Sequence, residues 1–153
     1  MKKAELPEGL LTALRKAGLV RKIWRTEDAQ GLPRGTGAYL LFIQIEAPVN
    51  VVYNRRSDAL EPGWYVYAGS ANGPGGLGAR ISRHFNEGKS VRWHVDHLTT
   101  KGNVWAMAVP GGAECPLVSA LEKTGEFSHP LEGFGSSDCV KCASHLLAFS
   151  GKP

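Results

Sequence analysis

Hydrophobic residues follow a strand-like pattern in two stretches of the first half of the chain. From Tyr39 to Ile45, apolar side chains occupy both sets of alternating positions, which predicts a strand with both faces largely covered. The stretch from Trp64 to Gly69 is rich in aromatic and β-branched residues, and we expect it to pair with the first. Shorter strands are predicted over 49–53 and 103–109, and a short apolar element over 144–149 closes the fold.

Apolar residues recur every three or four positions in three other segments, which is typical of amphipathic helices. The first segment covers about Pro7 to Ala29, and the second runs from about Leu77 to a stop at Gly88. A third helix is expected to begin near Glu114, with a proline in its first turn. The polar stretch 55–63 ends in Pro-Gly and is predicted to be a loop.

Together these elements predict an α/β fold, with a small, mainly antiparallel sheet flanked by helices. A chain of 153 residues is long enough for one domain with one core. Glycine, proline and polar residues gather in 31–37 and mark a junction. We therefore divide the chain into an N-terminal helical extension, residues 1–30, and a main domain, residues 31–153.

The extension has two interpretations. Basic residues at 21, 22 and 25 surround Trp24, a pattern that fits either a solvated helix face with a buried tryptophan or a nucleic-acid contact. We expect the extension to be dispensable for folding and to act as a basic arm. In the alternative, the apolar positions of its helix belong to the core of the main domain.

Net charge, apolar content and the number of cysteines limit the classes of function and cellular location that fit this chain. The formal net charge is +4 and the isoelectric point is near 9.1, a balance that suits a polyanionic partner such as nucleic acid. No apolar run approaches the ~18 residues that span a membrane, and the start lacks the apolar core of a signal peptide. Three cysteines, an odd number, argue against a secreted disulfide framework. We expect a cytoplasmic protein with reduced thiols and no membrane partner.

Several residues suited to phosphodiester chemistry follow one another along the chain. Cleavage requires an activated water, a stabiliser of transition-state charge and help for the leaving oxygen. Arginine binds phosphate oxygens through a charged fork, and one carboxylate can anchor a hard cation. The candidates are Tyr39 in Gly37-Ala38-Tyr39, Tyr67 in Tyr67-Ala68-Gly69, Arg80, His84 one helical turn later, and Glu114.

Each candidate also has a purely structural interpretation. A strand tyrosine is often a core residue with a bonded hydroxyl, and a carboxylate such as Glu114 is favoured at a helix start by the helix dipole alone. Arg80 and His84 share one helix face, where both could reach the same phosphate. The combination is more specific than any of its members.

This combination resembles the GIY-YIG nuclease superfamily, which is named for two such triplets. The resemblance implies a metal-dependent DNA endonuclease or a repair-linked relative. It places Tyr39 and Tyr67 near the nucleophilic water, Arg80 on the scissile phosphate, and Glu114 on one Mg²⁺ or Mn²⁺ ion. His84 stands where the superfamily has a histidine or a tyrosine.

Neighbouring residues are candidates for substrate contact. Arg83 lies on the polar side of the same predicted helix, and Gly69 and Ser70 begin a glycine-rich loop that lets backbone approach a polyanion. His94 and Asp96 occur in the phrase Trp93-His94-Val95-Asp96 and could act beside the cleft, although a buried, bonded His94 fits equally well.

A longer resemblance extends to about Phe149. It is to a branch of short, stand-alone microbial proteins of unassigned function, sometimes joined to a DNA-repair glycosylase. The polar residue that follows the metal glutamate in many nucleases has no clear counterpart, and Ser137 or Asp138 could substitute. The alternative function is therefore a nucleic-acid-binding module with this fold but without efficient cleavage.

A second cluster contains soft metal ligands. Cys139, Cys142 and His145 are evenly spaced, and Cys115 lies upstream, which is enough for a tetrahedral zinc site. The histidine is closer than usual ligand spacing, so reduced, metal-free thiols with a hydrogen-bonded His145 are the favoured expectation. A zinc-stabilised interaction domain is the third functional hypothesis.

Overall fold

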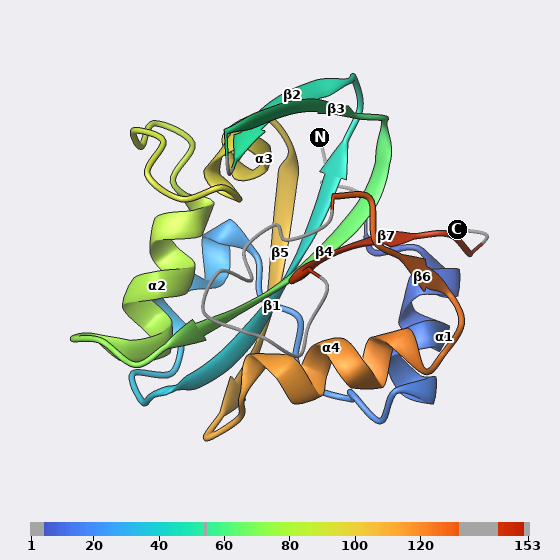
Figure 1. The fold of residues 1–153 in the computed structure, drawn as a ribbon. Helices are drawn as coiled ribbons and strands as arrows, with labels where there is room; N and C mark the ends of the chain where they lie inside the picture. Colours follow the sequence, from blue (N-terminus) through green and yellow to red (C-terminus); the bar gives the residue numbers. More distant parts are fainter. Residues whose placement is uncertain (1–4, 54, 132–143, 152–153) are drawn as a thin grey trace.

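A five-stranded antiparallel sheet forms the centre of the protein (Figure 1). The computed structural model describes residues 5–53, 55–131 and 144–151. The strand order is β5-β1-β4-β7-β6, and the strands are β1 (Gly37–Ile45), β4 (Gly63–Ala71), β5 (Asn103–Pro110), β6 (Phe127–Ser128) and β7 (Leu146–Phe149). The predicted pairing of the two apolar stretches is confirmed, because β1 and β4 are antiparallel neighbours.

Both faces of the sheet are covered, as the apolar pattern of β1 predicted. Leu40 and Phe42 point into one cluster of buried side chains, which includes apolar residues of α1 (Glu8–Lys16) and α4 (Glu114–Glu122). Tyr39 and Leu41 point into a second cluster on the opposite face, which includes residues of α2 (Gly76–Phe85) and α3 (Asp96–Thr99). The predicted α/β fold is therefore confirmed.

The N-terminal extension shares the core of the main domain. Leu10 is fully buried and Leu14 is 2% exposed, in the same cluster as the β1 side chains. The helical segment predicted over about 7–29 is shorter in the structure, because α1 ends at Lys16 and Gly18, a possible helix end, adopts a φ of +76°. Beyond it, Trp24 pairs with Ala106 of β5, and a short 3₁₀ helix, η1 (Thr26–Gly31), leads to the sheet.

A separate hairpin lies beside the main sheet. It consists of β2 (Val49–Tyr53), which was predicted, and β3 (Arg56–Leu60), where the sequence predicted a loop. The loop prediction is wrong. Four of the five β3 residues are exposed and only Leu60 is buried, so the hydrophobic pattern did not indicate a strand. Such a strand has no apolar alternation, and its backbone pairing with β2 defines it.

No helix within residues 5–53, 55–131 and 144–151 combines the length and the apolar content that a membrane crossing requires.

Candidate active site

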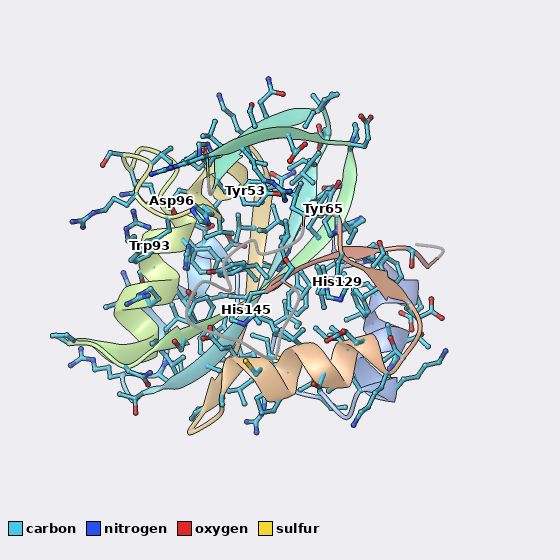
Figure 2. All side chains as sticks on the ribbon, viewed as in Figure 1. Tyr53, Tyr65, Trp93, Asp96, His129 and His145 are labelled. Carbon is cyan, nitrogen blue, oxygen red and sulfur yellow. The ribbon has the colours of Figure 1, made fainter. Side chains whose placement is uncertain are left out.

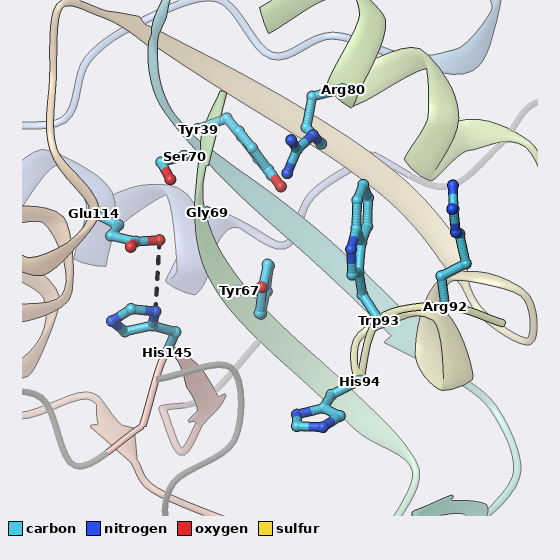
Figure 3. Close-up of a pocket in the computed structure, with 10 residues that line it drawn as sticks. All are labelled: Tyr39, Tyr67, Gly69, Ser70, Arg80, Arg92, Trp93, His94, Glu114 and His145. Carbon is cyan, nitrogen blue, oxygen red and sulfur yellow. Dashed lines mark ion pairs between the residues drawn. The ribbon is translucent and has the colours of Figure 1, made fainter. Parts of the chain in front are cut away.

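A cavity of about 290 Å³ opens where β1, β4, the start of α4 and the segments around α2 meet (Figure 3). Its walls carry most of the residues that the sequence singled out. The lining residues are Tyr39, Tyr67, Gly69, Ser70, Arg80, Arg92, Trp93, His94, Glu114 and His145. The expected convergence of Tyr67, Arg80 and Glu114 on one concave surface is therefore found.

The two tyrosines come from neighbouring strands. Tyr39 lies opposite Gly69 in the β1–β4 register, and Tyr67 lies two residues before Gly69 on the same face of β4. Another tyrosine of β4, Tyr65, donates its hydroxyl to the carbonyl of Glu61 at 2.6 Å and does not line the cavity (Figure 2). The strand register thus brings the two motif tyrosines to one site.

His84 lies behind Tyr39 rather than in the cavity wall. Its side chain is fully buried, and its Nε2 shares a hydrogen bond of 2.7 Å with the Tyr39 hydroxyl. Burial and the nearby positive charge of Lys89 lower the pKa of His84 to about 3, so the imidazole is neutral at physiological pH. His84 is not among the residues that line the cavity, and its hydrogen bond to Tyr39 connects it to the site. The expectation that it also reaches a phosphate stays a prediction.

Both cavity tyrosines stay protonated at neutral pH. Burial, reinforced by Tyr67 beside it, raises the pKa of Tyr39 well above its ordinary value. Burial and the nearby Glu114 raise the pKa of Tyr67 to about 12. The positive charge of Arg80 opposes both shifts without cancelling them. The tyrosines are therefore neutral hydroxyl groups that can orient a water molecule or a phosphate oxygen.

Arg80 is the arginine of α2 that reaches the cavity. Its guanidinium lies over the indole ring of Trp93, 4.4 Å from the ring centroid, and its head points toward the tyrosines (Figure 3). Among the described residues, no carboxylate lies within ion-pair distance of Arg80. Its charge is therefore available for an anionic ligand.

Arg83, the other candidate arginine of α2, is paired with a carboxylate. It does not line this cavity, and its guanidinium donates two hydrogen bonds to the carboxylate of Asp96, at 2.9 and 2.8 Å. The same carboxylate accepts the backbone N–H groups of Arg92 and Trp93. Burial alone raises the pKa of Asp96, but these hydrogen bonds outweigh it and lower the pKa to about 2. Arg83 thus stabilises the cavity wall, and the expectation that it contacts substrate stays a prediction.

Glu114 is the first residue of α4 and faces the tyrosines from the opposite wall. Its Oε2 lies 3.5 Å from Nδ1 of His145, whose side chain is 2% exposed (Figure 3). The other ring nitrogen of His145 lies 3.7 Å from the sulfur of Cys115. His145 therefore lies beside the first two residues of α4, next to the strand that closes the sheet.

The substrate candidates other than Arg83 all line the cavity. Gly69 and Ser70 form the end of β4, and His94 follows Trp93 in the opposite wall. The ring of His94 also packs edge-on against Tyr53, with 5.9 Å between ring centroids. Burial, with a smaller contribution from His97, lowers the pKa of His94 below its ordinary value.

Comparison with protein families matches residues 38–153 to the family described as Domain of unknown function DUF123. The chain belongs to the DUF123 family. Comparison with curated proteins and comparison with solved structures each found no match. DUF123 is a GIY-YIG-like domain family, and the matched part of this DUF123 chain holds every residue that lines the cavity.

The donors of the DUF123 cavity fit a magnesium-type ion better than zinc. Of the described residues that line it, only Glu114 carries a carboxylate, and the described chain holds no cluster of three or more His, Cys, Asp or Glu side chains arranged for a metal. Mg²⁺ commonly binds one or two carboxylates and completes its shell with water and substrate phosphate. A single Mg²⁺ or Mn²⁺ ion at Glu114 is compatible with this donor set.

Part of the second cluster falls outside this description. Cys139 and Cys142 of the hypothetical zinc site, and Ser137 and Asp138, lie outside the described residues. The expectation of reduced, metal-free thiols therefore stays a prediction.

Three lining residues were not chosen from the sequence as site residues. Arg92 gave no signal, because a lone arginine in a polar stretch is common. Trp93 was visible only as part of a phrase, and His145 was considered only as a possible zinc ligand or a hydrogen-bonded histidine. Their contacts with Arg80 and Glu114 depend on the tertiary fold.

Proposed function

We propose that this DUF123 protein is a metal-dependent endonuclease of the GIY-YIG type that hydrolyses phosphodiester bonds, with DNA as its substrate. The observation that carries the proposal is the meeting of four elements at one cavity. Tyr39 and Tyr67 come from two strands, and Arg80 and Glu114 come from two helices on opposite sides of them. Phosphodiester hydrolysis needs a positioned water, a stabiliser of transition-state charge and help for the leaving oxygen close to one phosphate, and these residues can supply those functions.

The residues divide the chemistry among them. Arg80 is positively charged and lies in the wall, so it binds the scissile phosphate and stabilises the charge that develops in the transition state. The neutral hydroxyls of Tyr39 and Tyr67 orient the attacking water, and His84 holds the first of these hydroxyls in place. A divalent ion bound at Glu114 would supply the charge that assists departure of the leaving oxygen.

Basic charge around the cavity supports a nucleic-acid substrate. Arg80 and Arg92 line it, and the whole chain carries a formal net charge of +4. The same features would also serve a module that binds nucleic acid without cutting it, which is the competing function. Cleavage itself must therefore be measured.

The test uses end-labelled DNA of several shapes: single strand, duplex, flap and branched junction. The purified protein is incubated with each in Mg²⁺, in Mn²⁺ and in EDTA. We expect product only with metal. An Arg80→Ala preparation purified in the same way controls for contaminating nuclease. Salt-sensitive binding without product on any substrate would establish the binding module instead.

A further inference from the structure

Two arginines of α2 lie against the ring of Trp93. The guanidinium carbon is 4.4 Å from the ring centroid for Arg80 and 3.9 Å for Arg83. Both distances are within the ~6 Å range of cation–π attraction. The two residues are three positions apart and are neighbours on the helix surface. One indole therefore contacts both guanidinium groups.

Among the described residues, Arg83 is paired with a carboxylate and Arg80 is not. Arg83 forms a two-point ion pair with Asp96, whose side chain is fully buried. Arg80 has no such carboxylate partner within the described part of the chain, and it faces the cavity. Asp96 balances the charge of Arg83, whereas the charge of Arg80 is available to a ligand in the cavity.

The backbone of Trp93 is itself held in place. Its N–H and that of Arg92 donate to the Oδ2 atom of Asp96, at 2.9 and 2.8 Å. A shift of Trp93 would therefore break hydrogen bonds to a buried, charged carboxylate, which is strongly unfavourable. The indole is a rigid surface and not a mobile loop side chain.

We propose that Trp93 is a positioning residue for Arg80: the Asp96–Arg83 pair fixes the indole, and the indole holds the Arg80 guanidinium at the phosphate position before substrate binds. Ordering a long side chain costs conformational entropy. Because Arg80 is already stacked on Trp93 in the free protein, substrate binding does not have to order this side chain. The effect of Trp93 on the cleavage rate rests on the proposed function, whereas its effect on the conformational order of the Arg80 side chain does not.

The first test needs no catalysis. NMR of the Arg Nε–Hε groups is recorded for the metal-free protein, for Trp93→Phe, which keeps an aromatic ring, and for Trp93→Met, which removes it. We expect an ordered, ring-current-shifted Arg80 signal in the wild type, retained in W93F and lost in W93M. An unshifted signal in the wild type would overturn the proposal, even if W93M failed to fold. An equally ordered Arg80 in folded W93M would do the same.

The second test is a double-mutant cycle on cleavage, using W93M, Arg80→Ala and the pair together. We expect W93M to slow cleavage at saturating DNA by up to about 10²-fold in the wild-type background, since small misplacements can cost that much. In the R80A background it should have little further effect. An equal loss in both backgrounds would show a general structural role and overturn the positioning role. If the wild type does not cleave, the proposed function fails, and the NMR result still decides the position of Arg80.

Discussion

The aromatic ring of Tyr39 lies directly against the backbone of Gly69, its partner across β1 and β4. A Cβ atom at position 69 would come within 2.9 Å of Cε2 of the tyrosine, and closer still to its Cζ and hydroxyl. Tyr39 can therefore reach His84 and the cavity only because residue 69 has no side chain. This contact explains why a glycine follows so closely after Tyr67.

Replacing Gly69 with alanine should displace Tyr39 and break its hydrogen bond to His84. We expect cleavage to fall by about 10²-fold, because the reacting groups lose their alignment. The matched control is Gly73→Ala, since a Cβ there meets nothing within 4 Å. Initial rates on the same labelled DNA compare the two variants. Equal activity of G69A and G73A would show that the position of Tyr39 does not matter.

Arg80 and Arg83 should separate activity from stability. Arg80→Ala removes a charge stabiliser, so we expect a loss of about 10²–10³-fold in rate with a change in unfolding free energy of about 1 kcal/mol or less. Arg83→Ala leaves the buried Asp96 without its ion pair, which should cost roughly 3 kcal/mol. Urea unfolding and cleavage are measured on both. The reverse pattern would exchange the roles assigned to the two arginines.

Acid should destabilise the protein through His84. Its pKa falls from 6.5 to about 3 on folding, so at intermediate pH the unfolded chain binds a proton that the folded protein does not. The free energy of unfolding is therefore unaffected by the titration of His84 above about pH 6.5, and it decreases as the pH falls toward 3. Between pH 7 and pH 4.5 the loss should be on the order of 2 kcal/mol.

The variant His84→Gln isolates this effect, since an amide can still bond Tyr39 but does not titrate. Unfolding free energies at the two pH values should differ less in H84Q than in the wild type. Asp96, with a pKa of about 2, stays ionised at both and does not interfere. The same loss in both proteins would assign the acid sensitivity to other groups.

Removing the first 30 residues should unfold the protein rather than trim an arm. Leu6, Leu10 and Leu14 are buried on the sheet, and each buried side chain of this kind contributes roughly 1.5–3 kcal/mol. Their sum is comparable to the ~5–15 kcal/mol that stabilises a typical domain. Thermal unfolding by circular dichroism tests a chain that begins at Gly31. A cooperative transition at the wild-type temperature would restore the basic-arm interpretation.

Local patterns allowed much of the fold to be predicted. The apolar residues of β1 fall on both faces, and both faces are indeed buried. The patterns failed where tertiary contacts decide. Leu19 and Ile23 have helical spacing, yet Gly18 ends the helix and Trp24 joins the edge of β5. The strand β3 carries polar residues and is defined only by pairing with β2.

For the cavity, too, local patterns predicted some residues and tertiary contacts decided the others. Its tyrosines could be predicted because the two triplets are attached to strands whose pairing fixes their position. Arg80 and Arg83, by contrast, both lie on the polar side of the predicted helix, and only the family resemblance separates their roles in the sequence. The location of Asp96, which lies 13 residues after Arg83, decides which arginine is neutralised. Contacts between distant segments of this kind leave no periodic signal.

Glutamate 114 provides the most direct test of the proposed nuclease. Glu114→Gln keeps the shape of the cavity wall but weakens its hold on a divalent ion. Glu122→Gln, at the last residue of the same helix and outside the cavity lining, is the matched control. Cleavage and DNA affinity are measured for both in Mn²⁺. We predict that E114Q loses cleavage by about 10²-fold or more while still binding DNA, and that E122Q cleaves as the wild type does. Metal-dependent cleavage by E114Q at the rate of E122Q would contradict the assignment of this cavity as the active site.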